Sequence, residues 1–295
     1  MHLSLSTRRG QSFGARGAIA VPVFLAIASM AANFASTASA ADPDPSLVRL
    51  ALDPDLSPDG GTLAFSWRGD IWTVSSNGGT ARRITLHDAQ DRYPKFSPDG
   101  NELAFISDRD GSPQVYAVSK KGGQPRQITH HTAGYQLEGW YPDGQGLLVS
   151  AQRDHFWKKP ERFFRVSATE RTADQLLFDD YGGDGALSPD GKRLLFTREG
   201  PAWWRKGYRG SQAAQIWLYD LQEKKFSSVI NQPTGARFPL WKPTGDGFYF
   251  VSSTSGSQNL WEHDLKKNES RQLTKLDDDS VVFPCLSRDG STIVF

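Results

Sequence analysis

The sequence contains a single cysteine, Cys285, which excludes an intramolecular disulfide framework. It also has no excess of charge of one sign, since 34 lysine and arginine residues balance 33 aspartate and glutamate residues at a formal net charge of +1. This balance gives no reason to expect nucleic acid as a partner. Common catalytic and phosphate-binding motifs are absent as well, because there is no G-x-S-x-G, no H-E-x-x-H and no P-loop. We therefore expect this chain to hold no catalytic residue and no cofactor.

Residue types that bind metals are present, but without the spacing of a metal site. His130 and His131 are the only adjacent pair among six histidines. The stretch "SDRDG" around Asp108 lacks the remaining ligands of a calcium loop, and "DDD" at 277–279 is an ordinary acidic loop. His263, in "LWEHDL", stands at the end of an expected strand, where we predict a solvated turn residue. The sequence therefore predicts no metal site.

The first forty residues have the layout of an export signal. A basic start, "RRGQSFGAR", precedes the apolar run "GAIAVPVFLAIASMAANF" and the small residues "ASTASA" before Ala41. This order is typical of a cleavable signal peptide at 1–40, with Ala38 and Ala40 at the small-residue positions. A membrane anchor is the alternative. The pair Arg8-Arg9 hints at twin-arginine export, although the usual aromatic residue does not follow it. We expect a periplasmic or secreted protein that meets the membrane only during export.

A six-fold repeat dominates the rest of the chain. Its copies are "LSPDGGTLAF", "FSPDGNELAF", "WYPDGQGLLV", "LSPDGKRLLF", "WKPTGDGFYF" and "LSRDGSTIVF", and their turn glycines lie 40 to 54 residues apart. In the turn, proline fixes φ, aspartate bonds to its own backbone and glycine accepts a positive φ. A period of this size, filled with short strands and tight turns, is typical of a propeller blade.

Each repeat supplies the strands of one blade. The apolar triplet after the turn is followed by a third strand, such as Ile71-Trp72 or Ile216-Trp217, and by an outer strand such as "RRIT" or "RQLT". The aromatic residues of these strands are expected to fill the space between blades. We predict an all-β propeller over residues 41–295, with five complete four-stranded blades and the start of a sixth. Since Phe295 falls inside the sixth blade, we expect a truncated six-bladed ring, with further domains outside this chain.

One face of the predicted ring carries the variable loops. The spacing between the second and third strands grows from 7 residues (Phe65 to Trp72) to 21 residues (Phe196 to Trp217). Such loops on a rigid scaffold are frequent binding positions. The two longest insertions, "QRDHFWKKPE" and "REGPAWWRKGYRGSQ", combine aromatic residues with cations that could hold a peptide or its carboxylate. Docking against another domain is the alternative. The candidate contact residues are Trp157, Lys158, Trp203, Trp204, Arg205, Lys206, Tyr208 and Arg209.

The stretch "WWRKGYRGSQAAQIW" is similar to a blade insertion of the tricorn-type serine proteases, and "LDPDLSPDGGTLAFSWRGDIWTV" resembles the opening of their first propeller. The resemblance covers residues 45–295. It implies a large peptidase with a second propeller, a PDZ-like module and a catalytic region using Ser, His and Glu, in which this propeller acts as a channel or filter. It also implies a cytoplasmic setting, in contrast to the export signal. Some members hold the substrate carboxylate with an arginine pair, but "ITHHTAGYQLEGW" lacks it, and His130 and His131 are the nearest cationic candidates.

Two other families remain open. A TolB-like propeller would be a non-enzymatic periplasmic platform for protein binding. A prolyl-oligopeptidase-type enzyme would use the propeller as a cap over an α/β-hydrolase domain. For the tricorn-like alternative we expect peptides, or the missing domains of the same protein, as partners, and a second copy of the chain is a further candidate partner.

Overall fold

The computed structural model describes residues 2–3, 47–154, 161–200, 204 and 207–295. All secondary structure within these residues is β-strand, and none of them forms a helix long and apolar enough to cross a membrane. The predicted signal peptide at 1–40 therefore lies outside the described residues, apart from the two-residue strand β1 (His2–Leu3), which pairs with β5 (Gly79–Thr80).

Five four-stranded antiparallel sheets follow one another along the chain. The first contains β2 (Leu52–Leu56), β3 (Thr62–Trp67), β4 (Asp70–Ser75) and β6 (Arg82–Arg83), and the second β7 (Asp91–Phe96), β8 (Glu102–Ser107), β9 (Gln114–Ser119) and β10 (Arg126–Gln127). The third contains β11 (Gln136–Trp140), β12 (Gly146–Ala151), β13 (Arg162–Ser167) and β14 (Gln175–Leu176). The fourth contains β15 (Gly183–Leu187), β16 (Arg193–Arg198), β17 (Gln215–Asp220) and β18 (Lys225–Ile230), and the fifth β19 (Arg237–Trp241), β20 (Gly247–Ser252), β21 (Asn259–Asp264) and β22 (Glu269–Gln272). A last pair, β23 (Cys285–Leu286) and β24 (Ile293–Val294), begins a sixth blade.

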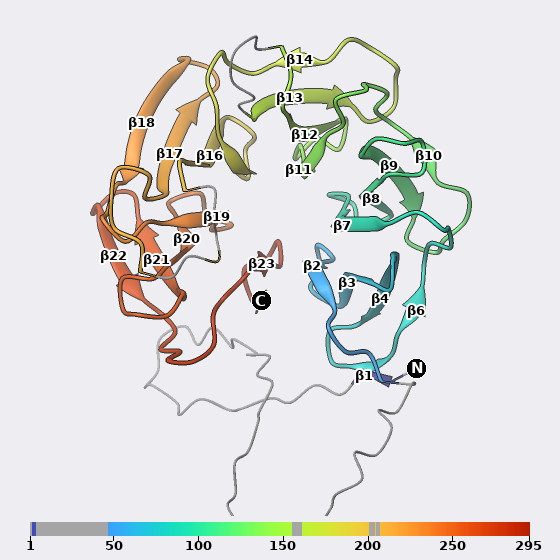
Figure 1. The fold of residues 1–295 in the computed structure, drawn as a ribbon, viewed down its shortest axis with the longest axis horizontal. Coiled ribbons are helices and arrows are strands. Elements are labelled where there is room, and N and C mark those ends of the chain that lie inside the picture. Colours follow the sequence, from blue (N-terminus) through green and yellow to red (C-terminus); the bar gives the residue numbers. More distant parts are fainter. Residues whose placement is uncertain (1, 4–46, 155–160, 201–203, 205–206) are drawn as a thin grey trace, which may run out of the picture.

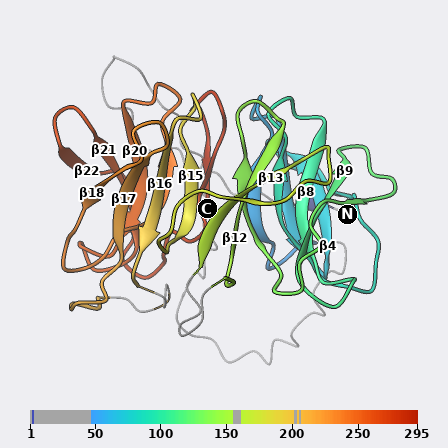
Figure 2. The same cartoon turned by 90° about the horizontal axis from the view of Figure 1, so that it is seen from above.

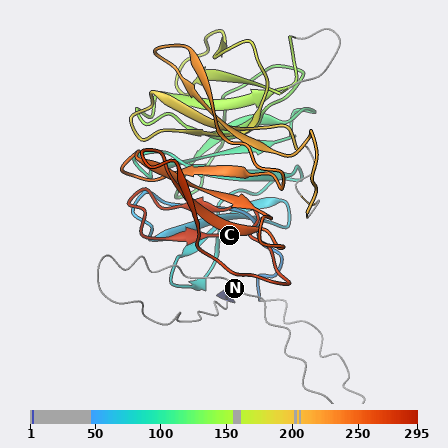
Figure 3. The same cartoon turned by 90° about the vertical axis from the view of Figure 1, so that its left-hand side faces the viewer.

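The sheets stand around a central axis, with the first strand of each blade innermost (Figure 1). Seen from the side, the blades lie next to one another with their strands roughly along the axis (Figures 2 and 3). The partial sixth blade lies beside the first, because Cys285 and Val294 share a buried cluster with Leu56 and Leu63. The prediction of an all-β propeller with five complete blades and a partial sixth is confirmed.

Apolar residues of neighbouring blades form the core between the sheets. The second strand of each complete blade is buried on both faces, as the fully buried Phe65, Phe105 and Phe196 show. Ile71 of the first blade packs in one cluster with Leu103 of the second. Burying one such side chain contributes about 1.5–3 kcal/mol. These repeated apolar positions form the core of the ring.

The repeated turn is held by its own side chains. In the first blade, Ser57 Oγ donates to Asp59 Oδ1 at 2.5 Å, and the backbone N–H of Thr62 donates to Ser57 Oγ at 2.9 Å. The backbone N–H of Gly60 donates to the carbonyl of Ser57 at 2.8 Å, and Gly60 has a φ of 69°. This geometry explains the serine, the aspartate and the glycine of the repeat.

The proline of the repeat links one blade to the next. A Cβ added to Gly100 would lie 3.1 Å from Cδ of Pro58 in the preceding blade, and one added to Gly191 would lie 3.4 Å from Cδ of Pro142. Each turn proline thus packs on the turn glycine of the following blade. The turns form a tight belt on one face of the ring, which we call the turn face.

The opposite face carries the variable loops, and we call it the insertion face. Here an arginine at the end of the second strand or two residues after it forms an ion pair in three of the blades. Arg109 binds the buried Asp91 through both carboxylate oxygens, at 3.0 and 3.1 Å, and lies 4.5 Å from the ring of Tyr116. Arg153 and Arg198 make similar contacts in the third and fourth blades, with Asp174 and Asp180 respectively. These pairs fix the loops that surround the insertion-face mouth of the ring.

Candidate functional site

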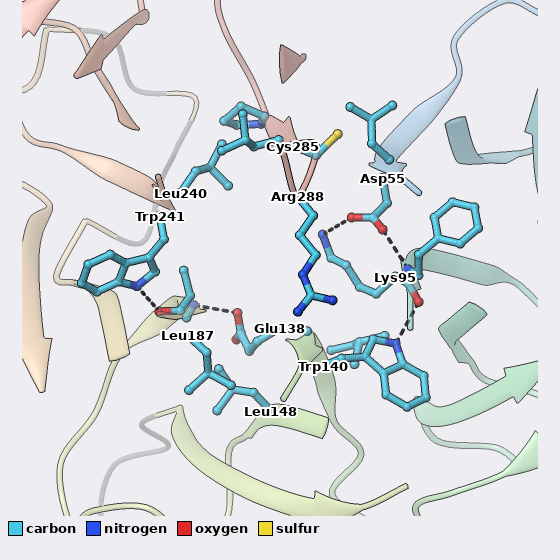
Figure 4. A pocket seen from close by; sticks show the side chains of 18 of the residues that line it. Asp55, Lys95, Glu138, Trp140, Leu148, Leu187, Leu240, Trp241, Cys285 and Arg288 are labelled. Atoms are coloured by element: carbon cyan, nitrogen blue, oxygen red, sulfur yellow. Dashed lines mark hydrogen bonds and ion pairs between the residues drawn. The ribbon is translucent and has the colours of Figure 1, made fainter. Parts of the chain in front are cut away.

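A cavity of about 570 Å³ runs through the centre of the ring. Its walls are the six innermost strands, β2, β7, β11, β15, β19 and β23, together with the turns that follow them (Figure 4). We call this cavity the channel. Its volume falls in the range of roughly 300–1,000 Å³ that is usual for ligand sites.

The channel wall owes its shape to a bulge repeated in the inner strands. The pairing register shifts within β2, β7, β15 and β19, and each shift contains a residue with positive φ, namely Asp53, Tyr93, Asp184 and Phe238 at 51–54°. A bulge bends its strand and redirects the side chains that follow. The repeated bulge therefore bends these four inner strands at the same height of the channel.

Proline is the commonest residue type of this wall. Nine prolines line the channel, four within or beside the inner strands and five in the turns: Pro54, Pro94, Pro239, Pro284, Pro58, Pro98, Pro142, Pro189 and Pro243. Since proline has one fixed backbone torsion, the wall is stiff.

Hydrogen bonds and an ion pair link neighbouring inner strands around the channel (Figure 4). Asp55 accepts a hydrogen bond from the backbone N–H of Phe96 at 2.8 Å and pairs with Lys95 Nζ at 3.3 Å. The indole N–H of Trp140 donates to the carbonyl of Lys95 at 3.0 Å, and that of Trp241 donates to the carbonyl of Ala186 at 2.9 Å. These side chains bridge adjacent blades, so the inner strands keep their spacing.

Three carboxyl groups gather near the insertion-face end of the channel. Glu138 accepts a hydrogen bond from the Ser150 hydroxyl at 2.7 Å and one from the backbone N–H of Gly185 at 2.8 Å. Burial, with smaller contributions from the nearby Asp184 and Glu161, raises the pKa of Glu138 to about 7, against the opposing effect of the two hydrogen bonds. Burial and Asp184 also raise the pKa of Glu161. Part of this cluster therefore keeps a proton near neutral pH.

Arg288 is the charged residue at the turn-face end. It occupies the place that proline holds in the other five turns, and its side chain points toward the centre of the ring (Figure 4). Its Nη1 donates to the carbonyl of Pro98 at 2.9 Å, which reaches past the first blade to the second. Where the other blades pack a proline on the next turn glycine, Gly60 faces Ser287 instead, with 3.4 Å between Ser287 Cβ and an added Cβ. Arg288 therefore does not pack on the next turn glycine as the prolines do, and its side chain extends into the channel.

Three of the eight insertion residues predicted as contacts are described by the structure. Trp204 is 66% exposed, Arg209 is exposed and Tyr208 is partly buried. The insertion reaches the fifth blade through a hydrogen bond of 3.4 Å from the N–H of Gly207 to the hydroxyl of Ser253. The remaining candidates, Trp157, Lys158, Trp203, Arg205 and Lys206, lie outside the described residues, so their role stays a prediction.

Further apolar side chains are exposed on the insertion face. Leu50 is 90% exposed, Leu86 is 78% exposed and Leu52 is 60% exposed, and all three lie at the start of the first blade or between the first two blades. Exposed apolar side chains that share one face are a feature of protein contact surfaces. Together with Trp204 they give the insertion face four large exposed apolar side chains among the residues that the structure describes.

The histidines do not form part of the channel wall. His130 and His131 are exposed in an inter-blade loop, where Nδ1 of His131 accepts a hydrogen bond from the N–H of Ala133 at 3.1 Å. The prediction for His263 is wrong, because this residue is 2% exposed and packs against Phe248. Its pKa is lowered by burial. Side chains alternate between the two faces of β21, and His263 lies on the face that packs against Phe248. The sequence pattern instead predicts a residue of the solvated turn that follows the strand.

Sequence reasoning also missed the charged residues of the channel. Aligning the six inner strands would have shown Glu138 where four blades have proline, and Arg288 where five turns have proline. Among the residues that the structure describes, no group of three or more His, Cys, Asp or Glu side chains is arranged to hold a metal ion.

Comparisons with known proteins agree with this architecture. A family model described as the tricorn protease N-terminal β-propeller domain matches residues 48–295. Tricorn protease homolog 1 of Streptomyces coelicolor is 28% identical over 248 residues, which are 81% of this chain but 22% of that protein. A TolB homolog of Chlorobium luteolum is 39% identical over 70 residues, which are 23% of this chain and 16% of that protein.

The crystal structure of the tricorn protease shares the fold, with a TM-score of 0.68 and 23% identity over 82% of this chain and 24% of that chain. The chain thus spans less than a quarter of the length of the tricorn proteins it matches. The match of the family model extends over both the repeated blades and the insertion of the fourth blade. The chain belongs to the family of tricorn protease N-terminal β-propeller domains.

Proposed function

We propose that this chain is the channel-bearing propeller of a serine peptidase that degrades peptides, and that it admits or steers peptides while other parts of the protein cleave them. The observation that carries the proposal is the channel of about 570 Å³ in a member of the tricorn N-terminal propeller family. No catalytic motif occurs in the sequence, which fits a role in passage and not in chemistry.

The insertion face is the proposed docking surface for the remainder of such a peptidase. Trp204 and Leu86 are large, apolar and exposed there, whereas the turn face carries the packed prolines and glycines of the repeated turns and their exposed aspartates. Replacing Trp204 by alanine is expected to weaken docking without changing the fold, because its side chain is mostly in solvent. We place the protein in the periplasm or outside the cell, on the strength of the signal-like residues 1–40, with the cytoplasm as the alternative.

Reversible blocking of the channel by a bulky thiol reagent tests whether peptides pass through it. A Cβ added to Gly139 in the channel wall would have no atom within 4 Å, so a cysteine at this position is expected to fit and to point into open space. The native Cys285 is buried, and burial raises its thiol pKa to about 12, so it will not compete for a thiol reagent. The full-length Gly139→Cys protein would be modified with a bulky methanethiosulfonate and then treated with a reductant.

We expect modification to slow hydrolysis of peptides at least several-fold and the reductant to restore it. The matched control is Gly61→Cys, which lies in an exposed turn outside the channel wall and tolerates a Cβ at 3.5 Å from its nearest neighbour, Asp59. Equal hydrolysis by the plugged and unplugged proteins would contradict the proposal.

A TolB-like platform for protein binding is the second candidate. It is favoured by the 39% identity to a TolB homolog over 70 residues and by the exposed apolar side chains of the insertion face. A full-length protein without peptidase activity that binds an envelope protein, and loses it on Trp204→Ala, would favour this candidate over the first.

A further inference from the structure

The outer edges of four of the five complete blades are protected against pairing with another chain. The outer strands β6, β10 and β14 are only two residues long, so each offers little backbone to a further strand. The outer strand of the fifth blade, β22, has four residues, and Glu269 and Arg271 expose charged side chains along it. Short edge strands and charged edge residues are the usual means by which proteins prevent edge-to-edge association.

The outer strand of the fourth blade, β18, lacks this protection over most of its length. It has six residues, it pairs with β17 on one side, and no other strand of the described chain pairs with its second side. Two views agree that it lies on the outer rim of the ring (Figures 1 and 2). After Lys225 it reads "FSSVI", without charge, proline or glycine. Its second side therefore presents backbone N–H and C=O groups with which an extended chain can pair.

The side chains of β18 hold the strand in place and leave its middle accessible. Phe226 and Val229 are partly buried and pack against the core clusters on the two faces of the fourth blade. Ser227 and Ser228 are exposed and small, so a second backbone can approach closely. The register with β17 shifts after Ser228, and the resulting bulge ends the regular part of the edge there. The free edge is therefore short and centred on the two serines.

The charges near β18 define the kind of strand that fits it. They are confined to the start of the edge, where residues 223–225 read "EKK" and Asp220 lies opposite Lys225 on β17, and they balance one another. The next charged residue in the chain is Arg237, so the remainder of the edge is neutral. A strand with a charged middle would lose hydration here without gaining an ion pair. The fitting partner has a free edge, a small and uncharged middle and charges at one end, and β18 itself has all of these properties.

An antiparallel pair of β18 strands from two copies brings no like charges together. A two-fold axis places one residue opposite its own copy. With Ser227 at the axis, Lys225 lies opposite Val229 of the second copy, and with Ser228 at the axis it lies opposite Asn231. The two Lys225 side chains are then at least as far apart as positions 225 and 229 of one strand, which is about 13 Å. This separation exceeds the screening length of about 8 Å at physiological ionic strength.

We propose that β18 pairs antiparallel with β18 of a second copy of this chain, around a two-fold axis at Ser227 or Ser228. The four-stranded fourth blades of the two copies then form one continuous sheet. Since the strands run roughly along the axis of the ring, the insertion faces of the two copies point in opposite directions (Figure 2). The contact lies on the outer rim and not on the channel wall, so this inference does not depend on the proposed passage of peptides.

Disulfide cross-linking between copies tests the pairing. Ser227→Cys and Ser228→Cys would be introduced separately into the full-length protein and oxidised with copper phenanthroline. Residues opposite each other in antiparallel strands have Cα atoms about 4.5–5.5 Å apart, which a disulfide can span. The matched control is Thr172→Cys, at an exposed position on the outer rim of the third blade, before β14. Cys285 is buried and common to all three proteins.

We expect one of the two serine variants to form a covalent dimer on a non-reducing gel at least about tenfold faster than the control, because pairing holds its two thiols together. Equal rates for the three cysteine variants would overturn the pairing, since the edge would then be open or covered by a different chain.

Two lysines at the axis give a second readout. Ser227→Lys combined with Ser228→Lys places like charges opposite one another between the copies, while the exposed positions let the blade keep its fold. We expect sedimentation at equal concentration to give this variant about half the mass of the wild type. Its melting temperature should match that of the wild type, and Thr172→Lys should keep the wild-type mass. A mass that the two lysines leave unchanged would also overturn the pairing.

Discussion

Replacing Glu138 by glutamine is expected to change how the stability of the propeller depends on pH. The pKa of Glu138 rises from 4.5 to about 7 on folding, mainly because of burial. Above pH 4.5 the unfolded chain loses this proton while the folded protein keeps it, so wild-type stability falls as the pH rises and levels off above about pH 7. Each pKa unit corresponds to about 1.4 kcal/mol, so the penalty reaches about 3 kcal/mol. The glutamine variant avoids it.

Urea unfolding at a series of pH values between 4.5 and 8 measures this difference. Glutamine can keep both contacts, accepting from the N–H of Gly185 with its oxygen and donating to Ser150 with its amide. We expect the variant to gain on the wild type by about 3 kcal/mol between the two ends of the series. Glu223→Gln, in the exposed turn between β17 and β18, should follow the wild type. Parallel curves for wild type and Glu138→Gln would refute the assigned protonation.

Three further changes test the scaffold. His263 has a lowered pKa in the fold, so wild-type stability should fall as the pH drops below about 6.5, where the unfolded chain binds a proton first; His263→Phe should lack this loss in melting curves at pH 7 and 5. Asp91→Ala leaves the guanidinium of Arg109 buried without its bidentate partner and should cost about 3–5 kcal/mol in urea unfolding, and a cost under 1 kcal/mol would contradict the structural role of the pair. Gly290→Ala places a Cβ 2.8 Å from Pro243 at a φ of 74°, so the melting temperature should drop, whereas a neutral result would show that the turn belt can relax.

Much of the fold was predictable because its determinants are local. Ser57, Asp59 and Gly60 bond to one another within four residues, and this is why the turn and the start of β3 could be located in each repeat. The apolar triplets after the turns needed no long-range information either, since a strand segment buried on both faces carries apolar residues at consecutive positions. The number of complete blades followed from counting these units.

The charged residues of the channel were not predictable in the same way. Glu138 binds Gly185 and Arg288 binds Pro98, and these partners are 47 and 190 residues apart in the chain. Their meeting depends on ring closure, which no single repeat encodes. His263 was misassigned because strand alternation, and not the polarity of its neighbours, sets its direction. Of the insertion residues, Trp204 and Arg209 are exposed, as expected for a contact loop. Their binding role depends on a partner surface, which the sequence of this chain does not encode.

The prolines of the channel wall have a consequence for anything that threads the ring. Each innermost strand is the end strand of its sheet, and such a free edge ordinarily recruits an extended chain as an extra strand. Pro54, Pro94, Pro239 and Pro284 remove the donor at the same height in four blades, and the N–H of Gly185 is already taken by the carboxyl of Glu138. A passing polypeptide therefore finds little backbone to pair with. It can slide along this lining without being trapped as β-structure.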